Sequence, residues 1–128
     1  MKKTTAAEAK KSRTVPVSEM VESIVGDKWS LSVLTAVRSG IHHPDDLERA
    51  CPGISTKVLN ERLRKMESFG ILEREEVGRT SPRVEYRLTA LGGRFVRLID
   101  DVHELQRAVD TGTVELRGSA RKARPKTG

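Results

Sequence analysis

Residues 51–70 read CPGISTKVLNERLRKMESFG. A Cys-Pro-Gly break precedes Ser55, whose hydroxyl can cap a helix, and a glycine suited to a helix end closes the stretch. Helical spacing separates Leu59, Leu63 and Met66, which predicts one buried stripe. The opposite face is polar and carries Lys57, Asn60, Glu61 and Arg64. The stretch therefore predicts an amphipathic helix over residues 55–70 with a polar outer face.

Three shorter helices are predicted before this one. The first spans about residues 16–26, with Ser18 as its N-cap. The second runs from a cap at Asp27 to residue 40, and apolar residues surround most of its circumference, so we expect it to be central. The third, over residues 44–50, opens with a proline and two aspartates, which suit a first helical turn.

A hairpin and a long helix are predicted after it. Residues 71–77 and 83–89 read as two strands joined by a polar turn; the second alternates cleanly and the first poorly, so the register is open. Thr89 caps the last helix. A narrow heptad seam on this helix comprises Leu91, Phe95, Leu98, Val102, Leu105 and Val109. Such a seam favours packing against another helix, and dimerisation is its natural use.

The order of these elements predicts a mainly α fold with a small β-hairpin wing (α+β). We interpret it as a winged helix-turn-helix over residues 15–110, with a long C-terminal dimerisation helix. Residues 1–14 and 111–128 are basic and short of large apolar side chains, so both are predicted to be mobile tails.

Charge and composition restrict the class of protein. The formal net charge is +6, of which each tail contributes +4 and residues 15–110 contribute −2. The basic tails therefore either bind a polyanion such as nucleic acid or only keep the protein soluble. No apolar run is long enough for a membrane span, and Cys51 has no second cysteine to pair with. We expect a cytoplasmic protein, nucleoid-associated when bound to DNA, and neither a secreted nor a membrane protein.

The candidate contacts to double-stranded DNA are the polar face of the helix over residues 55–70 and the turn of the hairpin. We expect this helix to lie in the major groove and the wing, residues 71–89, to lie on the flanking backbone. Lysine and arginine suit phosphates or guanine, and asparagine suits adenine. Glu61 either accepts from cytosine or repels wrong sequences, and Arg62 is expected to pair with an acidic neighbour instead. The predicted DNA-binding residues are Ser55, Thr56, Lys57, Asn60, Glu61, Arg64, Arg79, Thr80 and Arg83.

Three motifs resemble the HxlR-type branch of winged-helix transcription regulators, which are relatives of the MarR proteins. They are GDKWSL at residues 26–31, PGISTKVLNERLR at 52–64, and PRVEYRLT at 82–89 with Gly92 following. The resemblance runs from about Val15 to Leu105. It implies a homodimer that binds a pseudo-palindromic operator and represses or activates a neighbouring gene.

The resemblance also implies that the first and last helices form the dimer interface, through Met20, Val21 and Ile24 together with the heptad seam. Two features depart from the family pattern. Where many members have a sensing cysteine, in a Cys-Pro-Val context, this chain has Val15-Pro16-Val17. Where members often have Arg-Phe, it has His42-His43-Pro44. The signal therefore stays open between an unidentified small-molecule effector, a response at Cys51 and no sensing.

The sequence gives less support to other classes of function. The chain has no Gly-rich phosphate loop, nucleophile elbow or paired Cys/His motif, so no enzyme, cofactor or metal site is predicted. A thiol enzyme would need Cys51 beside His42 or His43, and nothing in the sequence positions them. A non-specific DNA-coating protein, driven by the basic tails, is the alternative to a sequence-specific regulator. A winged helix used only for protein contacts is disfavoured by the cations on the helix face.

Overall fold

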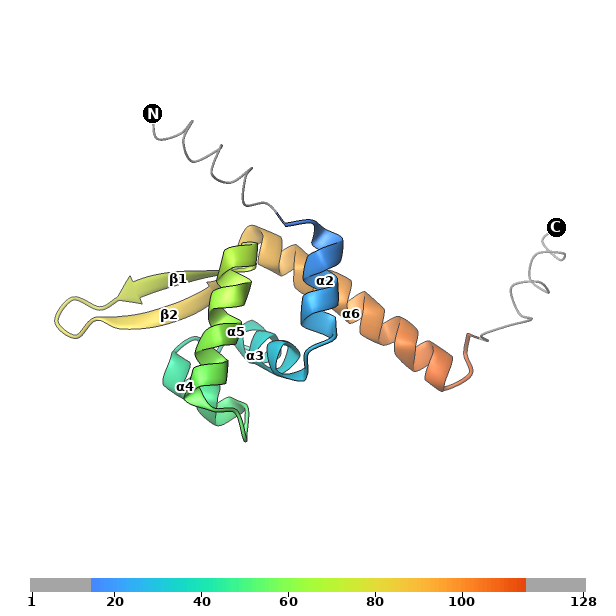
Figure 1. Cartoon of the computed structure of the whole chain (residues 1–128), viewed down its shortest axis with the longest axis horizontal. Helices are drawn as coiled ribbons and strands as arrows, with labels where there is room; N and C mark the ends of the chain where they lie inside the picture. Colours follow the sequence, from blue (N-terminus) through green and yellow to red (C-terminus); the bar gives the residue numbers. More distant parts are fainter. Residues whose placement is uncertain (1–14, 115–128) are drawn as a thin grey trace, which may run out of the picture. The chain divides into compact units, whose positions relative to one another are not determined.

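The computed structural model describes residues 15–114 (Figure 1). Its elements are α2 (Val17–Val25), α3 (Lys28–Arg38), α4 (Pro44–Ala50), α5 (Thr56–Phe69), β1 (Leu72–Val77), β2 (Arg83–Leu88) and α6 (Ala90–Asp110). The predicted winged helix-turn-helix, mainly helical with one hairpin, is confirmed. The predicted N-terminal tail and most of the C-terminal one lie outside the described residues.

The chain divides within α6 into two compact units, Met1–Phe95 and Val96–Gly128. In the first unit α3 is the central helix, as predicted, because it contacts α2, α4, α5 and β2. It buries Val33, Leu34 and Val37 against these neighbours. None of the helices within residues 15–114 combines the length and the hydropathy that a membrane span requires.

Local capping explains where most helices begin. The Asp27 carboxylate accepts from the Ser30 backbone N–H at 3.2 Å at the start of α3, as predicted. The predicted Ser18 cap of α2 is wrong: α2 begins at Val17, and the N-cap position belongs to Pro16, whose carbonyl accepts from the first turn. At the start of α4, Nδ1 of His43 accepts from the Asp45 N–H at 3.1 Å.

The hairpin resolves the register that the sequence leaves open. Strands β1 and β2 pair antiparallel with Leu72 opposite Leu88 and Val77 opposite Arg83. Beyond Leu72 the remaining residues of β1 are exposed or half-buried, because the hairpin extends away from the helices of its unit (Figure 1). The weak alternation of the first strand therefore reflects solvent on both of its faces.

The start of α6 lies close to the backbone just before β1. The Thr89 hydroxyl accepts from the Gly92 N–H at 2.9 Å, so Thr89 caps α6 as predicted. Gly92 is buried, and a Cβ atom at this position would collide with the Ile71 carbonyl oxygen. Glycine is therefore required here by close approach of two backbones rather than by an unusual backbone angle.

Candidate nucleic-acid interface

Helix α5 is held firmly on its inner side. The Ser55 hydroxyl accepts from the Val58 N–H at 3.1 Å, and Gly70 ends the helix with a left-handed φ of 85°. The buried stripe is the predicted one: Leu59, Leu63 and Met66. Contacts to α3, α4 and β1 surround this stripe. The polar side chains of α5 are therefore carried on a helix whose orientation is determined by its core contacts.

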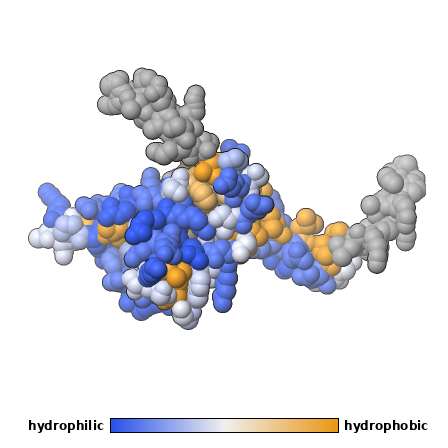
Figure 2. Space-filling view, viewed as in Figure 1, coloured by the Kyte–Doolittle hydropathy of each residue, from blue (hydrophilic) through white to orange (hydrophobic). Residues whose placement is uncertain are grey.

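The outer face of α5 is polar and open. In the view of Figure 2 the surface around α4 and α5 is mainly hydrophilic. The residues of α5 predicted to contact DNA lie here, whereas Ser55 lies at the N-cap of the helix. The Lys57 side chain is 83% exposed, and Asn60 is half-buried. Their spacing places them along one side of the helix: Thr56, Lys57, Asn60, Glu61 and Arg64.

Two of these residues already have anionic partners. The Thr56 hydroxyl lies 3.0 Å from each carboxylate oxygen of Glu48, a residue of α4 that the sequence analysis missed. Nζ of Lys57 lies 3.9 Å from Oε2 of Glu61. The missed contact joins residues on two different helices, and no local spacing in the sequence signals it.

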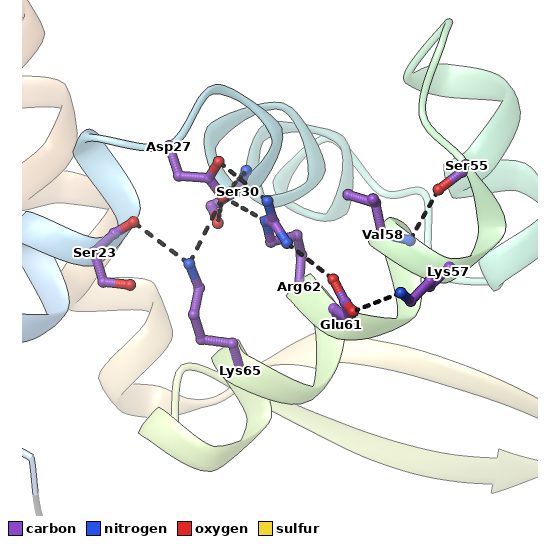
Figure 3. Close-up of polar contacts among 9 residues, drawn as sticks. All are labelled: Ser23, Asp27, Ser30, Ser55, Lys57, Val58, Glu61, Arg62 and Lys65. Atoms are coloured by element: carbon purple, nitrogen blue, oxygen red, sulfur yellow. Dashed lines mark hydrogen bonds and ion pairs between the residues drawn. The ribbon is translucent and has the colours of Figure 1, made fainter.

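The inner flank of α5 is tied to α3 by a charge cluster (Figure 3). Arg62 donates from Nε to Oδ2 of Asp27 at 2.5 Å, which confirms that Arg62 pairs with an acidic residue rather than facing outward. Nζ of Lys65 lies 3.7 Å from the same oxygen and 3.4 Å from the Ser23 carbonyl. The Ser30 hydroxyl donates to Asp27 as well.

The cluster changes the ionisation of its members. Burial raises the pKa of Asp27, but hydrogen bonds from Arg62 and Ser30 and the nearby charges of Arg62 and Lys65 outweigh it, so the pKa falls from 3.8 to about 2. Burial lowers the pKa of Lys65, and the charge of Asp27 opposes that change. Asp27 is therefore an anion at neutral pH and stabilises two cations on α5.

The predicted wing residues lie at the end of the hairpin and on its second strand. Arg79 and Thr80 are exposed in the turn, and Arg83 is exposed at the start of β2. Further along, Glu75 and Glu85 face each other across the two strands, and Arg87 forms an ion pair with both. Its Nη2 lies 2.6 Å from Glu85 and its Nε lies 3.4 Å from Glu75. The structure thus brings cations to two places, the outer face of α5 and the wing.

Cys51, His42 and His43 are not arranged as a reactive or metal-binding site. Cys51 is 2% exposed, and burial raises the pKa of its thiol, which disfavours the reactive thiolate. His43 caps α4, and the His42 carbonyl accepts from the Tyr86 N–H at 2.9 Å. Within the described residues no three His, Cys, Asp or Glu side chains are grouped as a metal site would require.

Comparisons with known proteins agree with this geometry. The model of the HxlR-like helix-turn-helix family matches residues 24–111. An uncharacterized HTH-type transcriptional regulator of Synechocystis, sll1512, is 38% identical over 90 residues, covering 70% of this chain and 66% of that protein. YkvN of Bacillus subtilis, named in the same way, is 34% identical over 84 residues, covering 66% of this chain and 71% of YkvN. The chain thus spans about two thirds of the length of these relatives.

Solved structures show the same fold. A transcriptional regulator of the MarR family from Enterococcus faecalis superposes with a TM-score of 0.67 at 31% identity, covering 77% of this chain and 89% of that one. The reduced form of the regulator YodB from B. subtilis gives a TM-score of 0.66 at 25% identity, covering 75% and 94%. Since the family model covers more than half of the sequence, and the capped helix α5 and the hairpin are both present, the chain belongs to the HxlR-like helix-turn-helix family.

Proposed function

We propose that this chain is a sequence-specific, DNA-binding transcriptional regulator that acts as a homodimer on a pseudo-palindromic operator. The observation that carries the proposal is the outer face of α5, a capped helix that buries one apolar stripe and exposes donors and acceptors along the other side. A helix of this kind fits the major groove, where base edges present distinct patterns of donors and acceptors.

The residues divide by role. Asn60 has the donor and acceptor pair that suits adenine, and Arg64 suits guanine or a phosphate. Arg79 and Arg83 are exposed on the wing and suit the flanking backbone, together with Thr80. Contacts of the first kind choose the sequence, and contacts of the second kind set affinity and its dependence on salt.

The dimer proposal rests on α6. Leu98 is 40% exposed and Leu105 is 59% exposed, one heptad apart, with half-buried Val102 between them. Leucines at this spacing suit a helix of a second copy. Six of the predicted interface residues keep surface for this purpose: Val21, Leu91, Leu98, Val102, Leu105 and Val109.

The other three predicted interface residues are buried within the single chain. Met20 and Ile24 on α2 and Phe95 on α6 are each less than a twentieth exposed, so they have little surface to offer a partner. We therefore restrict the proposed interface to the six residues above.

The test is a selection of duplexes from a randomised pool, followed by titration of the preferred duplex and a scrambled one at about 150 mM salt, where non-specific attraction is damped. We expect a preference of about a hundredfold or more, which is about 2.7 kcal/mol. Asn60→Ala should relax the preference at one base position, and Arg79→Ala should weaken both duplexes alike.

The outcomes separate the two candidate functions. Footprints at two half-sites about 34–36 Å apart would support the dimer. Binding that is equal for both duplexes and collapses with salt would instead indicate the DNA-coating alternative, which the formal net charge of +6 favours. If neither alanine variant altered binding of the preferred duplex, the proposed docking of α5 and the wing would be wrong.

A further inference from the structure

The first turn of α5 lies against two carboxylates of the chain itself. Thr56, the first residue of the helix, has its hydroxyl 3.0 Å from both oxygens of Glu48 on α4. Lys57, the second residue, has its ammonium 3.9 Å from Oε2 of Glu61. Hydroxyl and ammonium groups are common contacts of DNA phosphates. An anion of the protein therefore lies beside both the Thr56 hydroxyl and the Lys57 ammonium group.

Glu61 is held in this position from its other side. Its second oxygen, Oε1, lies 3.4 Å from Nη1 of Arg62. Arg62 in turn donates to Asp27 (Figure 3). The Arg62 and Asp27 side chains are each 25% exposed. A chain of alternating charges thus runs from the N-cap of α3 to Lys57 on the exposed face. Because Arg62 is anchored, Glu61 is less free to turn away from the first turn of α5.

Such carboxylates weaken contacts to phosphate more than contacts to a matching base. A phosphate must compete with Glu61 for Lys57 and is repelled by both glutamates. A base edge with an exocyclic amino group, such as cytosine N4, instead offers a donor that a carboxylate can accept. Binding to non-matching DNA depends on phosphate contacts alone, so it suffers most from the two anions.

We propose that Glu48 and Glu61 are specificity-determining residues that compete with DNA phosphate for the first turn of α5, and that Arg62 is the positioning residue that holds Glu61. The inference rests on the proposed function of the chain. It goes beyond that function in placing Glu48 of α4 beside the DNA-reading surface, and in giving Glu61 a position that Arg62 holds.

Glutamate-to-glutamine variants test the two anions. An amide oxygen can still accept from Thr56 or Arg62, so Glu48→Gln and Glu61→Gln remove charge and keep hydrogen-bonding ability. For the scrambled duplex we expect Kd to fall by about threefold for each variant and about tenfold for the double variant. For the preferred duplex we expect Kd to change by less than about twofold in Glu61→Gln, because the lost carboxylate contact to a base amino group offsets the gain in phosphate contact.

The dependence of binding on salt distinguishes the two glutamates. Glu61→Gln releases a cation to the DNA, so the slope of log Kd against log salt for the scrambled duplex should steepen by about 0.9. Glu48→Gln releases only a hydroxyl, and its slope should stay as in the wild type. The matched control is Glu67→Gln, which removes an exposed carboxylate of the same helix away from its first turn.

A double-mutant cycle tests Arg62. Arg62→Met should lower discrimination by about threefold in the wild-type chain and have no effect on discrimination beside Glu61→Gln. An equal loss in both backgrounds would assign Arg62 a structural role only. The inference would be overturned if the glutamine variants lowered Kd for both duplexes by the same factor, or changed Kd no more than Glu67→Gln does. Either result would leave the proposed function intact. A wild-type chain that does not discriminate would instead overturn the proposed function and this inference with it.

Discussion

Replacement of Asp27 by asparagine is expected to destabilise the fold by removing a negative charge and one acceptor oxygen. Asparagine caps helices about as well as aspartate, so the hydrogen bond to the Ser30 N–H can persist. What is lost is the negative charge that faces Arg62 at 2.5 Å and Lys65 at 3.7 Å, and also Oδ1, which accepts from Nη2 of Arg62 at 3.5 Å. Both cations are about three-quarters buried and would be left side by side without their anion.

The size and the pH dependence follow from the pKa of Asp27. A folded-state pKa of about 2 against 3.8 corresponds to about 2 kcal/mol of stability at pH 7. Because the folded-state pKa is the lower one, this stability is present above the unfolded-state value and is lost as the pH falls toward 2. The difference between wild type and Asp27→Asn should hold from pH 7 to 5 and shrink to about half by pH 3.

The assay is urea unfolding followed by circular dichroism at matched protein concentration, since dimerisation would shift the midpoint. A loss of about 2 kcal/mol corresponds to a midpoint lower by about 1 M urea. Glu67→Gln, which removes an exposed carboxylate, should change the free energy of unfolding by less than about 0.5 kcal/mol. A loss at Asp27→Asn no larger than this control, or one that is independent of pH, would refute the reasoning.

Three further predictions concern packing, reactivity and assembly. Gly92→Ala should lower the free energy of unfolding by about 3 kcal/mol, because the added methyl group meets the Ile71 carbonyl. Gly93 has open space around it, so Gly93→Ala should be neutral or stabilising by up to about 1 kcal/mol. Equal effects of the two variants in urea unfolding would contradict this prediction. The buried Cys51 thiol should react with a thiol reagent at least about a hundredfold more slowly in the native chain than in urea. A fast reaction of the native chain would make Cys51 a candidate sensor again. Leu105→Glu should weaken dimerisation by about a hundredfold in sedimentation equilibrium with helix content unchanged, and an unaltered mass would exclude the proposed α6 interface.

The sequence determined those features that depend on neighbours within a few residues. The caps at Asp27 and Ser55 and the buried stripe of α5 follow from local hydrogen bonding and helical spacing, and all three are present in the structure. The exception is Ser18, because α2 begins one residue before it and Pro16 takes the cap position. The three motifs were also sufficient to indicate the family.

Only the tertiary structure decided which residues from distant parts of the chain meet. Arg62 reaches Asp27 across 35 positions, and Glu48 reaches Thr56 across the turn between two helices. Packing also decided that Phe95 is buried while Leu105, on the same seam, stays exposed. Spacing along a helix shows which side chains share a face, but the helices packed around that face determine whether it is covered and which charges it meets.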